Sequence, residues 1–408
     1  MLKRISVKGF KSLSKLDLEL AQVNVLIGPN GSGKSNILEA IGLLSAAAGG
    51  RVDDQALLRR GVRPGTPSLY KTSLRKIRLL PAIYLEGEWN PASLAYAVGL
   101  NNPLERPQPA WRYKTETLQE GKHQLLTRGE AGGQLGGQRW NWKQEQAPRR
   151  DGGLAALAKV SQELSPAAVE FLDALGDFAI FAPVTPILRG IAPDPAPRNP
   201  VGLFGGRLPE AIGPLLDRKA GRFGRLKTSE LFRLLDWAND VSISPPSRQL
   251  LSPSVPTTRF VIRFGDRRMA SKRNQLTGYD ASEGALYVLF ALVLAMHPES
   301  PRILAVDNYD AGLNPLLAKE MTRIFIELLQ SAGGQRQVFL TTHQPQVLDG
   351  LNLADERIGL FAVERDRKSG QTMARRIRLS ADLLKKGGDR YSLSRLWTMG
   401  RLGAVPEL

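Results

Sequence analysis

The sequence is constrained most by one glycine-rich stretch near its start, residues 28–35, which reads Gly-Pro-Asn-Gly-Ser-Gly-Lys-Ser. This stretch has the spacing G-x-x-x-x-G-K-S of a phosphate-binding loop. The apolar run 22–27 is typical of a buried strand, and the apolar, proline-free run 37–48 is typical of a helix. A strand, a glycine loop and a helix in this order direct several backbone N–H groups at one anion. A simple Gly/Ser turn is the alternative interpretation. We favour the phosphate site because every fixed position of the pattern is filled in the expected context.

The loop residues have separate expected roles in holding a nucleoside triphosphate. Gly31 and Gly33 permit close approach of the backbone to a phosphate, and Lys34 would reach the β- and γ-phosphates. The hydroxyl of Ser35 would coordinate Mg²⁺. The candidate nucleotide-binding residues of this segment are Gly28, Asn30, Gly31, Ser32, Gly33, Lys34, Ser35 and Asn36.

Two further apolar segments predict strands that end close to this loop. Residues 302–307 end in Asp307, and residues 337–342 lead directly to His343. In an open parallel sheet the carboxyl ends of the strands converge on one crevice, where ligands bind. A carboxylate at such an end supports the Mg²⁺ of a bound nucleotide. We therefore predict Ser35 and Asp307 as the metal residues.

The middle of the chain differs in character from its two ends. Short strand-like segments between Pro, Gly and Asn clusters predict an antiparallel meander at about 78–145, and helical patterns follow at about 154–240. We expect a discontinuous α/β head formed by residues 1–50 and 255–408, with residues 51–254 inserted as an arm. Trp111, Trp140 and Trp142 fall in the meander, where cross-strand packing is a commoner explanation than stacking on bases.

The chain is strongly basic, with 56 Lys and Arg against 39 Asp and Glu and a net charge of +17. The excess is clustered at residues 1–15, 218–227, 259–273 and 365–401. Such clusters attract polyanions through counterion release, so DNA is an expected partner, although a basic solvated surface needs no partner. The chain shows no signal-peptide pattern and no run approaching about 18 apolar residues. We expect a cytoplasmic protein that does not contact a membrane.

These motifs together resemble the head domain of ABC-type ATPases of the SMC/RecF/OLD group. The residues that carry the resemblance follow the group's order: the phosphate loop with Asn36 after it, the signature-like Ser282-Glu283-Gly284, Asp307 and His343. The resemblance covers about residues 1–50 and 259–363 well and the middle loosely. The segments 307–308, 313–315 and 341–343 read Asp-Asn, Leu-Asn-Pro and Thr-Thr-His, as in bacterial anti-phage defence ATPases that resemble OLD and Septu components.

The resemblance implies an α/β P-loop NTPase fold of the ABC-head type, with a mixed, mainly parallel sheet, flanking helices and a large inserted arm of antiparallel strands and helices. It implies that two heads sandwich two ATP molecules with Mg²⁺. Ser282 and Gly284 of one chain would contact the γ-phosphate held by Lys34 of the other, and His343 would sense that phosphate. Taken alone, Ser282 is explained by a helix N-cap and His343 by a core histidine. Their order around the phosphate loop favours the nucleotide roles.

One position departs from the group's pattern. Where these ATPases usually have a glutamate after the strand-end aspartate, this chain has Asn308, and an amide cannot accept a proton from the attacking water. Asp310 and His343 are the candidates to replace it. We therefore expect slow ATP hydrolysis, and the predicted catalytic residues are Asp307, Asn308, Asp310 and His343.

The segment after Thr342 is basic and lacks the paired carboxylates of the Toprim nuclease module of OLD-type nucleases, so we expect no nuclease activity in this chain. Our hypothesis is a DNA-associated ATPase switch that forms a homodimer or higher homo-oligomer and regulates a separate effector, such as a nuclease, in anti-phage defence. Two alternatives stay open: a RecF-like repair or recombination ATPase, and an ATP-clamped scaffold with little hydrolysis. The long insertion disfavours a transporter subunit.

Overall fold

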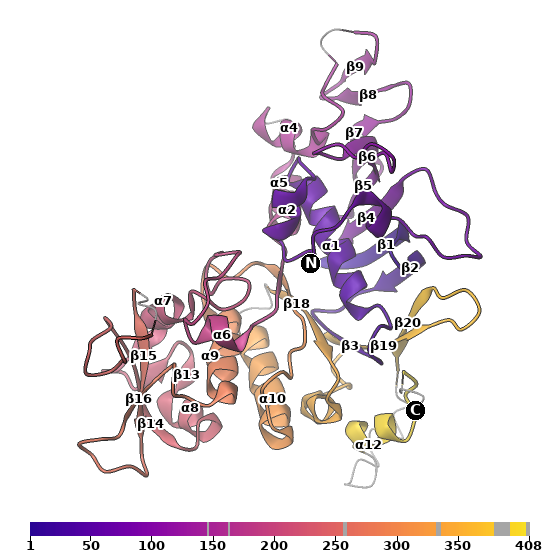
Figure 1. The fold of residues 1–408 in the computed structure, drawn as a ribbon. Helices are drawn as coiled ribbons and strands as arrows, with labels where there is room; N and C mark the ends of the chain where they lie inside the picture. The colour runs from indigo at the N-terminus through magenta and orange to yellow at the C-terminus, as the bar shows by residue number, and fades with distance from the viewer. Residues whose placement is uncertain (145–146, 162–163, 256–258, 332–335, 379–391, 405–408) are drawn as a thin grey trace.

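The structure is a computed structural model, and it describes residues 1–144, 147–161, 164–255, 259–331, 336–378 and 392–404. Two large β-sheets organise this part of the chain, and helices pack against both of them (Figure 1). The first large sheet contains the strand that precedes the phosphate loop, and the second begins with the N-terminal strand.

The first large sheet is mixed and mainly parallel. In spatial order its strands are β10 (Ala179–Phe181), β17 (Ile303–Val306), β18 (Gln337–Thr342), β3 (Val23–Ile27), β19 (Ile358–Arg365) and β20 (Thr372–Ile377). Neighbours from β10 to β19 run parallel, and β20 runs antiparallel to β19. Every residue of β3, β17 and β18 is buried, as expected for strands that are covered on both faces.

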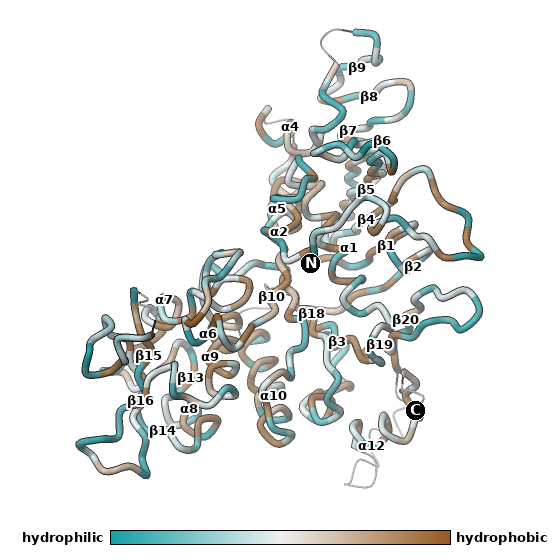
Figure 2. The backbone as a smooth tube through the Cα atoms, in the orientation of Figure 1, coloured by the Kyte–Doolittle hydropathy of each residue, from teal (hydrophilic) through white to brown (hydrophobic). Residues whose placement is uncertain are grey.

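Three long helices flank this sheet: α1 (Lys34–Ala48), α9 (Glu283–Met296) and α10 (Pro315–Ser331). Val25 and Ile27 of β3 lie in the core that contains α9 and α10, whereas Leu26 lies in the core that contains α1. This alternation follows from the two-residue period of a strand. Figure 2 shows the hydrophobic residues along α9 and β19. The predicted α/β P-loop NTPase fold is confirmed. The sequence pattern at 315–332 predicts a helix, and its last residue lies outside the described residues.

The second large sheet is antiparallel throughout. In spatial order its strands are β2 (Leu13–Glu19), β1 (Leu2–Phe10), β4 (Ile83–Trp89), β5 (Leu94–Asn101), β6 (Arg112–Glu120), β7 (His123–Arg128), β8 (Gly132–Leu135) and β9 (Gln138–Asn141). The predicted meander therefore forms, and β4 pairs along the free edge of β1. Such pairing covers an edge that would otherwise expose unpaired backbone groups.

The expected arm, residues 51–254, shares both large sheets with the expected head. Strands β4 to β9 continue the sheet that β1 and β2 begin, and β10 forms the edge of the parallel sheet. The sheets consequently do not follow the division that we expected from the sequence.

The remaining elements are short. The helices are α2 (Asp54–Leu58), α3 (Pro67–Tyr70), α4 (Leu154–Val160), α5 (Pro166–Gly176), α6 (Thr185–Leu188), α7 (Leu208–Ile212), α8 (Thr228–Leu234) and α12 (Leu393–Thr398), with 3-10 turns η1 (Gly213–Leu215) and η2 (Pro345–Gly350). Two three-stranded sheets comprise β11 (Leu216–Asp217), β12 (Arg222–Phe223) and β13 (Leu226–Lys227), and β14 (Ala238–Ser244), β15 (Val261–Asp266) and β16 (Gln275–Thr277).

One predicted helix ends early. The pattern at 229–239 predicts a single helix, but α8 ends at Leu234 and β14 begins at Ala238. Two long-range interactions override the local helical preference. Strand β14 pairs with β15, and the rings of Trp237 and Phe264 make a tilted contact with their centroids 5.3 Å apart.

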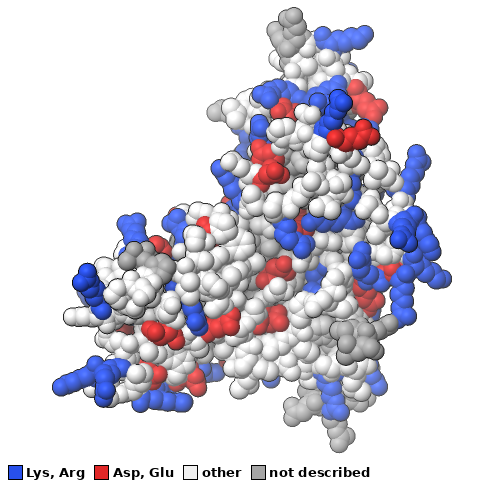
Figure 3. Space-filling view, viewed as in Figure 1, with Lys and Arg blue, Asp and Glu red and all other residues white. Residues whose placement is uncertain are grey.

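Charge is unevenly distributed on the face shown in Figure 3, where lysine and arginine side chains gather most densely at the right. Within the described ranges, every helix is too short or too polar to cross a bilayer. Part of the basic segment 365–401, namely 379–391, lies outside the described residues.

A buried ion pair joins the second sheet to α4. The side chains of Glu116 and Arg128 are both fully buried, with Oε2 and Nε 3.7 Å apart. Glu116 also accepts hydrogen bonds from the Tyr96 hydroxyl (3.1 Å) and from two backbone N–H groups at the start of α4 (2.8 and 3.0 Å). Arg128 donates to the carbonyls of Arg149 and Gly152. Burial raises the pKa of Glu116 and lowers the pKa of Arg128, so each charge depends on the other.

We predict that Glu116→Gln lowers the free energy of unfolding by about 3–5 kcal/mol, because Arg128 stays buried without its counter-charge. Urea unfolding at pH 7 measures this loss. The double variant Glu116→Gln/Arg128→Met removes both charges and should recover a large part of the lost stability. Equal losses in the single and double variants would contradict the ion-pair explanation.

Candidate nucleotide-binding site

The phosphate loop connects β3 to α1 and is pressed against β19 and β20. Gly33 has a φ of 106°, and a Cβ at this residue would lie 2.1 Å from Oγ1 of Thr372. A Cβ at Gly28 would lie 2.1 Å from the carbonyl oxygen of Val363. Glycine is therefore required at both positions, because a side chain would displace β19 at Gly28 and β20 at Gly33. Gly31, with a φ of 75°, needs glycine for its backbone conformation alone.

The side chain of Lys34 lies inside the loop that it belongs to. Its Nζ donates to the carbonyl oxygens of Gly28 (2.7 Å) and Pro29 (3.1 Å). Burial lowers the pKa of Lys34 to about 8, and the carboxylates of Asp307 and Asp310 oppose this effect. A desolvated ammonium group gains from a nearby anion.

A second loop residue also fits a phosphate ligand. Ser32 is buried, and within the described chain its hydroxyl has no hydrogen-bond partner. A buried polar atom normally has a partner, so this hydroxyl and the Lys34 ammonium both fit a phosphate group.

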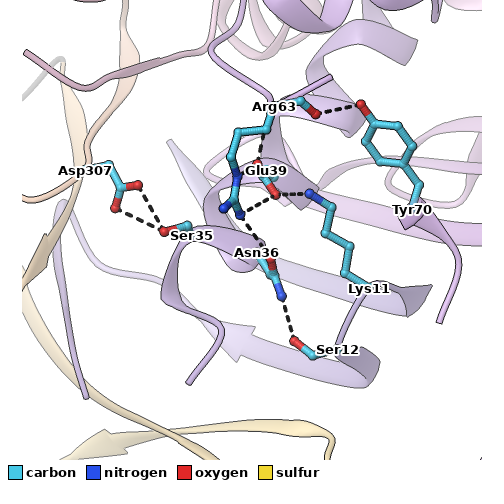
Figure 4. Close-up of polar contacts among 8 residues, drawn as sticks. All are labelled: Lys11, Ser12, Ser35, Asn36, Glu39, Arg63, Tyr70 and Asp307. Carbon is cyan, nitrogen blue, oxygen red and sulfur yellow. Dashed lines mark hydrogen bonds and ion pairs between the residues drawn. The ribbon is translucent and has the colours of Figure 1, made fainter. Parts of the chain in front are cut away.

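The predicted metal residues, Ser35 and Asp307, lie next to each other. The Ser35 hydroxyl donates to Asp307 Oδ2 at 3.0 Å and lies 3.3 Å from Oδ1 (Figure 4). Thr341 donates to the same carboxylate, and its own hydroxyl accepts from the backbone N–H of Asn308 at 2.8 Å. No group of three or more His, Cys, Asp or Glu in the described ranges could hold a metal. The serine and aspartate fit Mg²⁺ that takes its other ligands from phosphate and water.

The other predicted catalytic residues lie at the same strand ends. The backbone N–H of His343 lies 3.4 Å from Asp310 Oδ1. Partial burial and the Lys34 ammonium lower the pKa of His343, so its imidazole is neutral at pH 7. Asn308 is exposed and has a φ of 54°, in the left-handed region that asparagine tolerates better than most residues. The fold thus gathers Asp307, Asn308, Asp310 and His343 beside the phosphate loop.

The signature residues lie elsewhere. Ser282 caps the start of α9 without a side-chain cap hydrogen bond. Ser282 and Gly284 line a cavity of about 610 Å³ together with Gly312 and Asn314, and no phosphate-loop residue lines it. Gly284 is closely packed, because a Cβ there would lie 2.9 Å from the Gly312 carbonyl oxygen. Within one chain, Ser282 and Gly284 are therefore not brought to the loop.

Sequence reasoning missed a buried carboxylate behind the loop. Glu39 of α1 is 2% exposed, forms an ion pair with Lys11 and accepts from Arg63 Nε at 2.6 Å (Figure 4). On the same helix, Asn36 donates to the Ser12 hydroxyl at 2.7 Å. One signal was available in the sequence: Glu39 is the single charged residue in the apolar run 37–48.

A strand, a glycine loop with a buried lysine, and a serine–aspartate pair at adjacent strand ends define a P-loop nucleotide-binding protein. Residues 1–53 match the family described as RecF/RecN/SMC N terminal domain. Residues 215–349 match the family described as AAA domain, putative AbiEii toxin, Type IV TA system. Both segments are similar to parts of ABC-type ATPase heads of the SMC/RecF/OLD kind, and each match covers less than half of this chain.

Several curated relatives match short parts of the chain. The OLD nuclease of Thermus scotoductus is 50% identical over 44 residues, which are 11% of this chain and 8% of that protein. The DNA replication and repair protein RecF of Magnetococcus marinus is 41% identical over 64 residues, 15% of this chain and 17% of that protein. A RecF from Clavibacter michiganensis is 29% identical over 136 residues, 33% and 32% of the two chains. The chain thus spans at most about a third of these relatives.

Solved SMC head domains align along most of the chain at low similarity. An SMC head bound to the C-winged helix domain of ScpA has a TM-score of 0.49 and 14% identity, covering 93% of this chain and 98% of that one. The SMC head domain from Thermotoga maritima has a TM-score of 0.43 and 15% identity, covering 93% and 99%. The strand order and the phosphate loop of this chain define its fold without these alignments.

We predict that Glu39→Gln lowers the free energy of unfolding by about 1–3 kcal/mol at pH 7, because Lys11 and Arg63 lose their shared partner. Burial raises the pKa of Glu39, but hydrogen bonds from Arg63 and Lys11 outweigh it, so the folded-state pKa lies below the ordinary value. The stabilisation is therefore present above the unfolded pKa and is lost as pH falls through the folded one.

Denaturant unfolding of wild type and Glu39→Gln at pH 7 and at several values down to pH 4 tests this prediction. The difference in stability between the two proteins should narrow towards pH 4. A difference that stays constant over this range would contradict it.

Proposed function

We propose that the protein is an ATPase switch in which two heads dimerise around ATP. One observation carries this proposal. The phosphate loop, Asp307 and His343 lie together at adjacent strand ends, whereas Ser282 and Gly284 line a separate cavity. The N-terminus of the 14-residue helix α9 thus borders a cavity that no residue of the chain's own phosphate loop lines, and it is available to a phosphate held by another chain.

In the proposed site each residue has a defined task. Lys34, Ser32 and the backbone N–H groups of the loop would bind the β- and γ-phosphates, and Ser35 with Asp307 would hold Mg²⁺. When bound, Mg²⁺ neutralises charge that develops on the phosphate oxygens. Thr341 orients the Asp307 carboxylate.

The proton of the attacking water needs an acceptor other than Asn308. Asp310 and the neutral imidazole of His343 are the groups on this side of the site that can accept it, and the backbone of His343 approaches Asp310. Because neither stands at the position after Asp307, we propose slow turnover and a long-lived ATP-bound dimer.

We predict that Lys34→Ala and Ser282→Arg each abolish steady-state ATP hydrolysis, and that an equimolar mixture of the two variants regains about a quarter of wild-type activity. In a mixed dimer one site combines an intact loop with an intact signature, while the other site carries both changes. Hydrolysis is measured by phosphate release from the separate and mixed proteins.

Leu316→Arg, in the same cavity but outside the signature, is a matched control that keeps the phosphate contacts. Failure of the mixture to regain activity, with both variants folded, would overturn the two-chain site. ATP binding without turnover in wild type would instead favour the alternative of an ATP-clamped scaffold.

Asn308→Glu should increase the hydrolysis rate at least about tenfold, because it restores a general base after Asp307. The left-handed backbone at this position costs glutamate about 1 kcal/mol, which is small beside that gain. Asn308→Gln supplies the same length without a carboxylate and should leave the rate unchanged. No increase with Asn308→Glu would mean that Asn308 does not limit turnover.

We further propose a cytoplasmic role in DNA-associated anti-phage defence, in which the ATP-bound dimer regulates a separate effector such as a nuclease. This proposal is supported by similarity to an OLD nuclease and to a putative AbiEii toxin family. Similarity to several RecF proteins supports the alternative of a DNA repair ATPase. Hydrolysis that responds to gapped DNA without any effector would favour the repair role.

A further inference from the structure

Three loops that are far apart in the sequence meet beside the phosphate loop. They are residues 11–15, which form the β1–β2 turn and the start of β2, the segment 71–82, and the β19–β20 turn. Ser14 in the first donates to Gln371 in the third at 2.5 Å. Leu74 in the second lies next to Gly370, at 3.4 Å from where a Cβ there would be. Figure 1 shows segment 71–82 and the β19–β20 turn side by side at the right of the molecule.

These loops carry the dense basic surface visible at the right of Figure 3. We call this surface the basic ridge, and its exposed cations are Lys15, Arg75, Lys76, Arg78 and Lys368. Segment 71–82 contains no acidic residue. No ion pair between described residues involves any of the five. Asp366, in the β19–β20 turn, accepts hydrogen bonds from the backbone and hydroxyl of Ser369.

Two other basic segments differ from the ridge because the fold uses some of their cations. Arg218 forms an ion pair with Asp240, and Arg225 donates to the backbone carbonyls of Ala295 and Leu328. In the segment 259–273, Arg267 donates to backbone carbonyls around α8. These arginines hold the structure together, whereas the ridge cations remain available to a partner.

We propose that the basic ridge binds the phosphate backbone of a nucleic acid. Long cations on three adjoining loops suit a chain of repeated phosphates, and contacts of this kind carry no base sequence information. Lysine is depleted in the cores of protein–protein interfaces, and three of the five ridge cations are lysines. The chemistry therefore favours a nucleic acid over an acidic protein, although Leu79 in the same segment is 49% exposed.

One of the loops that carry the ridge leads into a residue that is hydrogen-bonded to the phosphate loop. Thr372 follows the β19–β20 turn, and its hydroxyl donates to the Ser32 carbonyl at 2.7 Å. The backbone N–H of Thr372 donates to the Ser12 carbonyl in the β1–β2 turn at 2.8 Å. This inference deepens the proposed function by giving its DNA partner a surface, but ridge binding itself requires no ATP hydrolysis.

The test measures fluorescence anisotropy of a labelled DNA duplex of about 30 base pairs at several salt concentrations, without nucleotide. The triple variant Arg75→Ala/Lys76→Ala/Arg78→Ala should bind at least about tenfold more weakly. Its slope of log K against log salt should fall by about three, one for each lost phosphate contact. The control Arg218→Ala/Lys219→Ala/Arg222→Ala removes the same charge elsewhere and should keep the wild-type slope.

Equal weakening in both triple variants would overturn the proposal, because net charge alone would explain the binding. Unchanged DNA affinity with lost binding of labelled polyglutamate would overturn it in favour of an acidic protein partner. Lys34→Ala should bind DNA like wild type. If the ridge variant binds DNA like wild type while hydrolysis depends on Lys34, this inference fails and the ATPase proposal stands. If the ridge variant loses DNA binding while no Lys34-dependent hydrolysis is found, the ATPase proposal fails and this inference stands.

Discussion

The close approach of the phosphate loop to β19 and β20 is the constraint on which the site depends. At Gly28 and Gly33 the space for a Cβ is already filled, by the Val363 carbonyl and the Thr372 hydroxyl. This packing fixes the loop against the sheet before any ligand arrives, so its backbone N–H groups need little reorganisation on binding. It also forces the Lys34 side chain inward, where desolvation lowers its pKa and makes a phosphate a favourable partner.

Sequence reasoning located the residues whose positions follow from chain order. Asp307 and His343 end apolar strands, and parallel strands bring their ends together, so both could be placed beside Lys34 before the structure was known. The partners of the loop could not be placed in this way. Thr372 reaches it because β20 turns back antiparallel on β19, and Glu39 acquires its role through Lys11 and a loop residue.

Long-range pairing also explains what was missed in the fold. The predicted meander is present in the structure, but local sequence patterns do not reveal that its first strand, β4, pairs with the edge of β1. The basic ridge has the same origin. Clusters at 1–15 and 365–401 are visible in the sequence. The segment that joins them, 71–82, has three exposed cations, and its place beside the other two depends on long-range contacts that local sequence patterns do not predict.

The backbone conformation at position 308 by itself favours asparagine over glutamate, apart from any role in catalysis. Its φ of 54° is a conformation that asparagine adopts more readily than glutamate, and the Thr341 hydroxyl holds its N–H. A change of side chain at Asn308 therefore leaves Asp307 oriented, because Thr341 bonds both residues. If the amide slows hydrolysis, the proposed ATP-bound dimer would live longer, and the interval in which the proposed partner could respond to it would lengthen. The β19–β20 turn, which carries Lys368 of the basic ridge, leads into Thr372, and Thr372 is hydrogen-bonded to the loop proposed to hold the phosphates.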